Sequence, residues 1–435
     1  MDNQRTDKKR IVVLGGGFAG LNFIKHIDHR KFSVTLIDKH NYHTFPPLFY
    51  QVASSGLDAS SISFPFRREF RKRGARGTSL IMSSVEKVDT VKKTVTTPWA
   101  TVEYDILVIA LGCTNNFFGK PDLVKSVYTL KSAAQAIRCR NDILDHLERA
   151  IVTEDPELRR RLLSFVIVGG GPTGVEIAGA LGEMKKYIIP REYPEIDRDE
   201  VNITLLEGSP KLLGAMSGKS SEAALKYLTD DLMVNVRLNT LMDDYRKDIV
   251  TLSDGETVEA GMVIWTAGIV GTPFPIIGGS GEDLQRTRGG RISVDGLNRV
   301  EGLDDVYALG DIALMTADPD FPSGHPQLAQ VAIQSAKNLA QNLNKDSANP
   351  FRYYDKGSMA TIGRNRAVVD MKKVFFKGFW AWLTWMFIHL ISLLGMRNKV
   401  TVLINWLWAY FTYSTSLRLI MHPNRFPLRS RWGER

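Results

Sequence analysis

Two glycine-rich turns, each followed by an acid, are the parts of this 435-residue sequence whose residue types and spacing could do chemistry. The glycines of the first turn are Gly15, Gly17 and Gly20. They follow an apolar run at residues 11–14, and Asp38 ends the next apolar run. In a dinucleotide site the first glycine permits a tight turn, the second lets the backbone approach a pyrophosphate, and the third lets a helix pack on the strand. The helix N-terminus then offers free N–H groups to the phosphates, and the acid accepts hydrogen bonds from a ribose.

The same pattern returns further along the chain. Gly169, Gly171 and Gly174 follow an apolar run at residues 164–168, and Glu207 ends the next run. An acid at this place favours a free ribose 2′-hydroxyl and repels a 2′-phosphate. The two residues after Glu207 supply no cation, so the second turn predicts NADH rather than NADPH.

Two complete turns allow either a duplicated NAD site or two sites for different dinucleotides. One nicotinamide cannot usefully reduce another, whereas a flavin accepts a hydride and releases electrons singly or in pairs. We therefore expect FAD at one turn and NADH at the other.

The elements that must hold these turns are short apolar strands alternating with helical patterns, which predict parallel sheets covered by helices. Two further buried strands are expected at 104–112, ending in Gly112, and at 304–313. The second contains Asp311, which could bind the ribityl chain of a flavin or simply end a strand. Because it lies beyond the second turn, the first domain is predicted to be discontinuous. The expected parts are an FAD-binding domain at 1–160 and 276–365, an inserted NADH-binding domain at 161–275, and a C-terminal membrane-associated region at 366–435.

Composition excludes several classes of protein. The net charge is +9, but eight Lys/Arg against one acid lie from Phe375 onward, so the body is nearly neutral and a uniformly basic nucleic-acid binder is not expected. Cys113 and Cys139, the only cysteines, stand too far apart for a CxxC redox pair. They also exclude a cysteine-rich zinc site and a disulfide framework, and no metal is expected.

The tail holds six of the eight tryptophans and two uncharged runs, Phe379–Met396 and Val400–Leu417. A buried helix pair, a membrane-spanning hairpin and helices lying in the membrane interface are the three alternatives. We favour the interface, because Trp and Tyr suit the depth of lipid headgroups and basic residues suit anionic lipid. Those basic residues are Arg418, Arg425, Arg429 and Arg431.

The chain resembles the type II NADH dehydrogenases, which are single-chain, non-proton-pumping NADH:quinone oxidoreductases within the two-dinucleotide-binding-domain flavoproteins. The resemblance rests on "VVLGGGFAGL" (12–21), "HTFPPLFYQVASSGL" (43–57), "GGGPTGVEIAGAL" (169–181), "WTAGI" (265–269), "ALGD" (308–311) and "QLAQVAIQSA" (327–336). It implies electron transfer from NADH through FAD to a membrane quinone, ubiquinone or menaquinone, in a respiratory chain. It also implies monotopic attachment, which we expect at the cytoplasmic face of the cell membrane, and the sequence leaves open whether the chain forms a homodimer.

The resemblance also implies roles for single residues. Residues expected to bind FAD are Gly15, Gly17, Gly20, Asp38, Lys39, Pro47, Gly112, Asp311, Ala329 and Gln330. Residues expected to bind NADH are Gly169, Gly171, Gly174, Glu207, Ala267 and Gly268. Gln330 and Gln334 are expected to contact the quinone, or to tether the flavin. Glu176 is expected to lie near the nicotinamide and flavin and to help proton delivery, unless it is only an acid at a helix start.

Other functions remain as alternatives. The chain could reduce a protein acceptor of the ferredoxin or rubredoxin type, act like a sulfide:quinone oxidoreductase, or sense NADH without turnover. A disulfide reductase is excluded because the sequence has no CxxC.

Overall fold

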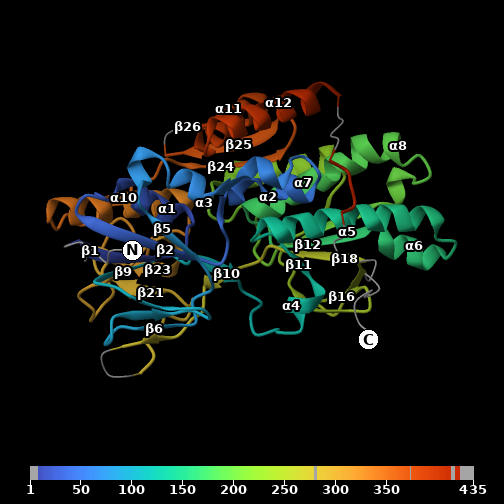
Figure 1. The fold of residues 1–435 in the computed structure, drawn as a ribbon. Coiled ribbons are helices and arrows are strands. Elements are labelled where there is room, and N and C mark those ends of the chain that lie inside the picture. The colour runs from blue at the N-terminus through green and yellow to red at the C-terminus, as the bar shows by residue number, and fades with distance from the viewer. Residues whose placement is uncertain (1–7, 279–281, 373, 413–416, 422–435) are drawn as a thin grey trace, which may run out of the picture. The chain divides into compact units, whose positions relative to one another are not determined.

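The computed structural model describes residues 8–278, 282–372, 374–412 and 417–421 (Figure 1). It divides into two compact units, each made of three segments of the chain. Unit 1 comprises Met1–Thr44, Ser63–Asn116 and Ile269–Lys356; unit 2 comprises Phe45–Ile62, Phe117–Gly268 and Gly357–Arg435.

Unit 1 is built on a five-stranded parallel sheet in the order β22-β9-β1-β2-β5. The central strand β1 is buried on both faces at Ile11, Val12, Val13 and Leu14, which is why it reads as a continuous apolar run. The strands of this sheet are β1 (Lys9–Leu14), β2 (Phe32–Asp38), β5 (Ser79–Met82), β9 (Ile106–Ile109) and β22 (Val306–Ala308).

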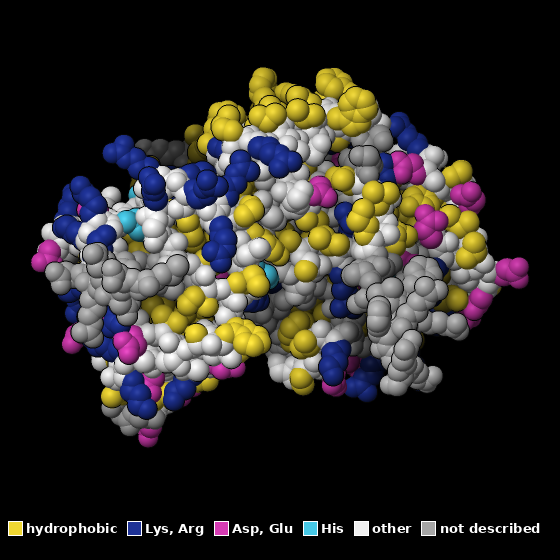
Figure 2. All heavy atoms as spheres, viewed as in Figure 1, with side chains coloured by type: hydrophobic (Ala, Val, Ile, Leu, Met, Phe, Trp, Pro, Cys, Tyr) yellow, Lys and Arg dark blue, Asp and Glu magenta, His cyan; other side chains and the backbone are white. Residues whose placement is uncertain are grey.

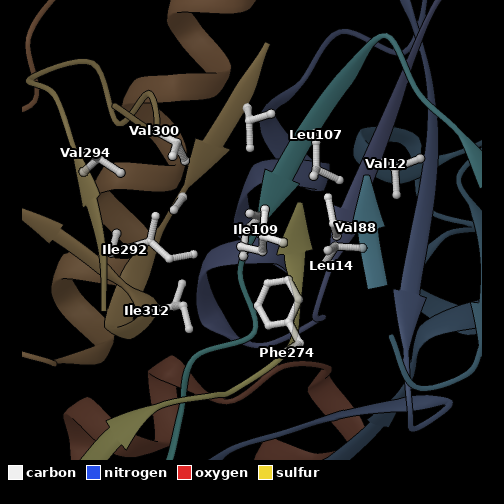
Figure 3. Close-up of a cluster of buried hydrophobic side chains, with 14 of the residues drawn as sticks. Val12, Leu14, Val88, Leu107, Ile109, Phe274, Ile292, Val294, Val300 and Ile312 are labelled. Atoms are coloured by element: carbon white, nitrogen blue, oxygen red, sulfur yellow. The ribbon is translucent and has the colours of Figure 1, made fainter. Parts of the chain in front are cut away.

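Two helices, α1 (Phe18–His26) and α10 (Ala329–Lys345), pack against each other beside this sheet. Its other side carries a large apolar cluster, in which side chains of β1 and β9 meet Phe274, Ile292 and Ile312 (Figure 3). Smaller elements of unit 1 are β3 (Tyr42–Thr44), β4 (Ser63–Pro65), α3 (Phe66–Glu69), β6 (Lys87–Asp89), β7 (Thr94–Thr96), β8 (Thr101–Glu103), β10 (Cys113–Asn115), β19 (Ile269–Gly271), β20 (Ile276–Ile277), β21 (Ile292–Val294) and β23 (Ala313–Met315).

Unit 2 repeats the parallel arrangement, in the order β11-β18-β12-β13-β14. A three-stranded antiparallel sheet, β15-β16-β17, accompanies it. The strands are β11 (Tyr128–Thr129), β12 (Ser164–Val168), β13 (Asn202–Leu206), β14 (Asn235–Arg237), β15 (Met242–Arg246), β16 (Ile249–Leu252), β17 (Thr257–Glu259) and β18 (Met262–Trp265). The helices are α2 (Phe49–Ala53), α4 (Leu123–Ser126), α5 (Ala133–Val152), α6 (Pro156–Leu162), α7 (Pro172–Glu183), α8 (Ile189–Glu192) and α9 (Gly218–Lys226).

The C-terminal part of unit 2 is an antiparallel sheet followed by two helices. The sheet consists of β24 (Ser358–Gly363), β25 (Arg366–Met371) and β26 (Val374–Lys377), and the helices are α11 (Phe379–Ser392) and α12 (Met396–Thr412). Helix α7 packs on β24, and α11 packs on β25. None of the described helices is both long enough and apolar enough to cross a membrane. Arg425, Arg429 and Arg431 lie outside the described residues.

The predicted α/β class with two Rossmann-like sheets is confirmed. The compact units nevertheless divide the chain differently from the predicted boundaries. Residues 117–160 belong to unit 2, because β11 pairs with β18 and α5 packs on α2 and α6. The same unit also contains Gly357–Arg435.

Candidate functional site

One edge of the unit 1 sheet gathers most of the residues predicted to bind FAD. In a parallel sheet the carboxyl ends of all strands lie at the same edge, and ligands bind in the crevice outside it. Gly15 follows β1, Asp38 ends β2, Gly112 follows β9, and Asp311 follows β22. The fold therefore brings these four positions, which are far apart in the sequence, to one edge.

Each of the three glycines of the first turn is explained by a different feature of the structure. Gly15 has a φ of +91°, and a Cβ there would lie 2.6 Å from the carbonyl oxygen of Ala110. A Cβ on Gly20 would lie 1.9 Å from the carbonyl oxygen of Gly15, so only glycine lets α1 approach β1 this closely. A Cβ on Gly17 would meet no atom within 4 Å. Packing thus explains the first and third glycines, and the space beside the second fits a pyrophosphate at the start of α1.

Asp38 holds this turn in place. Its carboxylate accepts hydrogen bonds from the backbone N–H groups of Gly16 and His40, both at 2.7 Å. A carboxylate offers about four acceptor positions, so others remain for a ribose. Lys39, the next residue, is exposed.

The Asp311 segment is fixed by its neighbours. The Cys113 thiol donates to the Asp311 carboxylate at 3.2 Å, which joins the start of β10 to the segment that follows β22. Gly310 has a φ of +71°, and a Cβ there would come within 3.1 Å of Ala332 on α10. The segment therefore lies beside the start of α10, where Ala329 is the first helical residue.

The two glutamines of α10 differ in their bonding. The Gln334 amide is engaged at both ends, because it donates to the Tyr354 carbonyl oxygen at 3.0 Å and accepts from the Tyr354 N–H at 3.1 Å. The Gln330 oxygen has two longer contacts, from the Tyr353 hydroxyl at 3.4 Å and from the backbone N–H of Lys356 at 3.3 Å. Pro47, also predicted to bind FAD, lies in unit 2.

The second turn, in unit 2, repeats the geometry of the first. Gly169 has a φ of +106°, and a Cβ on Gly174 would lie 1.8 Å from the Gly169 carbonyl oxygen. A Cβ on Gly171 would again meet no atom within 4 Å. Glu207 accepts hydrogen bonds from the backbone N–H groups of Gly170 and Ser209, just as Asp38 does in unit 1.

The segment after β18 completes this edge. A Cβ on Gly169 would lie 2.8 Å from the backbone nitrogen of Ala267, so Ala267 lies directly against the turn. Gly268 follows with a φ of +69° and is exposed. All six residues predicted to bind NADH are therefore in unit 2, at the carboxyl ends of β12, β13 and β18.

Helix α7 continues from the second turn to the wall of a cavity within unit 2. Glu176, Ala180 and Glu183 line it at spacings of four and three residues, which places them on one face of the helix. The cavity volume is about 160 Å³. Its other lining residues come from α2 and the residues after it, from β24, and from the C-terminal helices: Tyr50, Gln51, Ser54, Ser55, Gly56, Ile188, Thr361, Gly363, Arg364, Trp382, Trp385, Met386, Trp406, Ala409, Tyr410 and Arg418.

Two carboxyl groups line this cavity, of which Glu176 is buried and Glu183 is half-buried. Burial raises the pKa of Glu176 well above its usual range, and a backbone hydrogen bond from Thr361 opposes the rise only in part. Burial likewise raises the pKa of Glu183, against hydrogen bonding from the backbone N–H of Arg364. The pKa of Tyr50 is raised well above its usual range by burial and by these two carboxyl groups. Their surroundings therefore favour the protonated, uncharged forms of Glu176, Glu183 and Tyr50.

The C-terminal helices form an aromatic wall. The Arg364 guanidinium donates to the carbonyl oxygens of Ala409 at 2.6 Å and Tyr410 at 2.8 Å, near the end of α12. Trp385 is 1% exposed and stacks on His389 with ring centroids 3.9 Å apart. Its indole N–H has no hydrogen-bond partner among the described residues, so this buried donor is available to an acceptor on a ligand.

Sequence reasoning did not single out most of these lining residues. Tyr50 and Gln51 lie inside the segment 43–57, which carries part of the family resemblance, and Trp385 and Trp406 lie in the tryptophan-rich tail. The sequence therefore indicated both regions, although not these residues. Glu183 carried none, because an acid near the end of a helix is common.

Comparison with known proteins was made for sequence and for fold. A model of the pyridine nucleotide-disulphide oxidoreductase family matches residues 9–336, and a model of the NDH2 C-terminal domain matches residues 355–413. Two type II NADH:quinone oxidoreductases of Mycobacterium tuberculosis are similar along most of their length. One is 31% identical over 92% of this chain and 87% of its own length, and the other is 33% identical over 92% and 86%. The chain belongs to the type II NADH:quinone oxidoreductases.

Solved structures agree on the fold of this family. NDH2 from Plasmodium falciparum superposes with a TM-score of 0.87 at 22% identity, covering 95% of this chain and 100% of that one. The sulfide:quinone oxidoreductase of Aquifex aeolicus shares the fold at a TM-score of 0.70 and 20% identity, covering 94% and 96%. Since the fold is common to both, the sequence relatives and not the fold distinguish the type II enzymes. The predicted family is confirmed, as are FAD as cofactor, NADH as substrate and quinone as electron acceptor.

Proposed function

We propose that the chain oxidises NADH at the turn of unit 2 and passes the electrons, through FAD held by unit 1, to a membrane quinone in a respiratory chain without pumping protons. The observation that carries this proposal is the presence of two complete dinucleotide turns in one chain without a CxxC. In each turn a Cβ on the second glycine would meet no protein atom within 4 Å, and the acid accepts a hydrogen bond from a backbone N–H of the turn. Bound FAD would accept the hydride and release the electrons to the quinone. Asp38 and Glu207 then each bind a ribose and hold a turn ready for a pyrophosphate.

The cavity of unit 2 suits the quinone ring. A cavity of about 150 Å³ in another protein holds one benzene ring, and this one is of that size. Burial favours the protonated form of the Glu176 carboxyl beside it by raising its pKa, which supports a role in delivering a proton to the reduced quinone. A Glu176→Gln variant that oxidises NADH and reduces quinone at normal rates would remove Glu176 from the reaction.

We propose different roles for the two glutamines of α10. Gln330 is the better candidate for contacting quinone or flavin, because the hydrogen bonds that its side-chain oxygen accepts from Tyr353 and Lys356 are long, at 3.4 and 3.3 Å. Gln334 would have to break two backbone hydrogen bonds to do so, and we assign it to positioning the segment at Tyr354.

The outer faces of α11 and α12 support attachment to a membrane surface. Hydrophobic side chains gather over these two helices (Figure 2). Exposed side chains on them include Trp380, Phe387, Ile391, Ile404, Trp408 and Phe411. A contiguous apolar face of this kind marks an interaction site, and its aromatic side chains suit the depth of lipid headgroups. We place it at the cytoplasmic face of the cell membrane, and light scattering would decide whether the protein there is a homodimer.

The proposal is tested by the two half-reactions. Protein purified from membranes is mixed anaerobically with NADH while the visible absorption of the flavin is recorded, and ubiquinone-1 is then added. Bleaching by NADH and rapid recovery on quinone are expected. Bleaching without recovery would point to a protein acceptor, and the absence of a flavin band would refute the proposal.

A further inference from the structure

Three side chains of unit 2 form a hydrogen-bonded chain from a C-terminal helix to the cavity. The Trp406 indole N–H on α12 donates to the Gln51 side-chain oxygen at 2.8 Å. The Gln51 amide nitrogen donates to the Tyr50 hydroxyl oxygen, also at 2.8 Å. All three residues line the cavity, and Trp406 and Tyr50 are buried.

The direction of this chain follows from what each group can do. An indole N–H can only donate, so the side-chain oxygen of Gln51 must face Trp406. The amide nitrogen of Gln51 must then face Tyr50, and it too can only donate. The Tyr50 oxygen is therefore an acceptor in this bond, and the single hydroxyl proton of Tyr50 has to point elsewhere.

The surroundings of Tyr50 leave the cavity as the destination of that proton. Within the described part of the chain, the Tyr50 hydroxyl has no other hydrogen-bond partner than Gln51. The ring of Trp385 packs edge to face against the Tyr50 ring, with centroids 6.3 Å apart. Because burial and the nearby carboxyl groups raise the pKa of Tyr50, the hydroxyl keeps its proton at neutral pH.

Resting on the proposed function, we infer that Tyr50 donates a hydrogen bond to a quinone oxygen in the cavity and that Trp406, acting through Gln51, is the positioning residue that sets the direction of this bond. Negative charge develops on the quinone oxygen as electrons arrive, and a donor aimed at that oxygen beforehand stabilises it without reorganisation. The helix that carries the proposed membrane face thereby also orients a substrate contact.

The test uses full-length, FAD-loaded protein and ubiquinone-1. Tyr50→Phe removes the donated proton and keeps the ring, and Trp406→Phe removes the indole N–H and keeps a smaller aromatic ring. Binding of oxidised ubiquinone-1 to the oxidised protein is measured by calorimetry, where no electron transfer can occur. We expect Tyr50→Phe to weaken binding about fivefold, as for one hydrogen bond, and to slow flavin reoxidation by ubiquinone-1 at least tenfold. Trp406→Phe should act in the same direction by a smaller factor.

The combination of both substitutions separates positioning from general damage. If Trp406 acts through Tyr50, Trp406→Phe has no further effect on reoxidation in the Tyr50→Phe background. Trp99→Phe, at a surface position 84% exposed in unit 1, is the matched control and should behave as wild type. Multiplying effects in the double variant, or unchanged binding and reoxidation in Tyr50→Phe, would overturn the inference. Failure of the wild type to be reoxidised by ubiquinone-1 would instead refute the proposed function.

Discussion

Replacing Gly171 by alanine is expected to weaken NADH binding without weakening the fold. Gly171 has a φ of −71°, which alanine adopts freely, and the new methyl group would meet no protein atom within 4 Å. The methyl would instead occupy the space where the backbone must approach the pyrophosphate. Losing one charge-assisted hydrogen bond costs about 1.5–3 kcal/mol, which raises the dissociation constant for NADH roughly tenfold to a hundredfold.

The third glycine should respond in the opposite way. A methyl group on Gly174 would lie 1.8 Å from the Gly169 carbonyl oxygen and 2.8 Å from the Thr266 hydroxyl, so α7 must move away from β12. Overpacking of this kind costs about 1–3 kcal/mol and lowers the melting temperature by about 2–4 °C for each kcal/mol. Gly174→Ala is therefore the destabilised variant and Gly171→Ala the stable one.

The assay measures thermal unfolding, FAD content, and the NADH concentration that half-bleaches the flavin under anaerobic conditions. The matched variant in unit 1, Gly17→Ala, should lose FAD while any flavin-loaded fraction keeps its normal response to NADH. If Gly171→Ala lost FAD and Gly17→Ala raised the NADH requirement, the assignment of the two units would be reversed. An unchanged NADH requirement in Gly171→Ala would refute the reasoning about the open second glycine.

Three other predictions address the acid, the tail and the pH dependence. Glu207→Arg should shift the ratio of kcat/KM for NADPH over NADH at least tenfold, because a cation replaces the charge that repels a 2′-phosphate; equal ratios for variant and wild type would count against this role. Arg364→Met should lower the free energy of unfolding by about 1.5–3 kcal/mol, because the carbonyl oxygens near the end of α12 lose a charged donor. An unchanged melting temperature would contradict this stabilising role of Arg364. Burial lowers the pKa of His389 to about 4, below the ordinary value near 6.5, so the unfolded chain takes up a proton first and stability falls as the pH drops from about 6.5 toward 4. His389→Phe keeps the stack on Trp385 and should lose less melting temperature between pH 7 and pH 5 than the wild type, whereas an equal loss would exclude His389 as a cause.

The turns could be predicted from sequence because their requirements are local. Gly15 and Gly174 are fixed by atoms within the same strand–turn–helix unit, so the pattern of glycines and apolar runs carries the geometry. The strand at 164–168 was placed at its observed bounds for the same reason.

The cavity could not be predicted, because its walls come from segments that meet only in the folded unit. Nothing in the apolar pattern says that α2, α7 and α12 share a space, or that β11 pairs with β18 and draws residues 117–160 into unit 2. The sheet β24–β26 was also missed. The Gln334 amide forms its two hydrogen bonds with the backbone of Tyr354, twenty positions away, and no local sequence pattern predicts such bonds.

Helix α7 begins at the turn predicted to hold NADH and ends at Glu183, so one rigid element serves both the nucleotide and the cavity. At Gly179 it also lies so close to β24 that a Cβ would come within 2.4 Å of the Ile362 carbonyl oxygen. A substitution that reshaped this wall for a different quinone would therefore disturb the nucleotide end or the sheet. Selection for a new quinone is expected to proceed through the cavity-lining residues of α11 and α12, which contribute no residue to the predicted NADH turn. In directed evolution toward another quinone, accepted changes should accumulate in these two helices and leave α7 untouched.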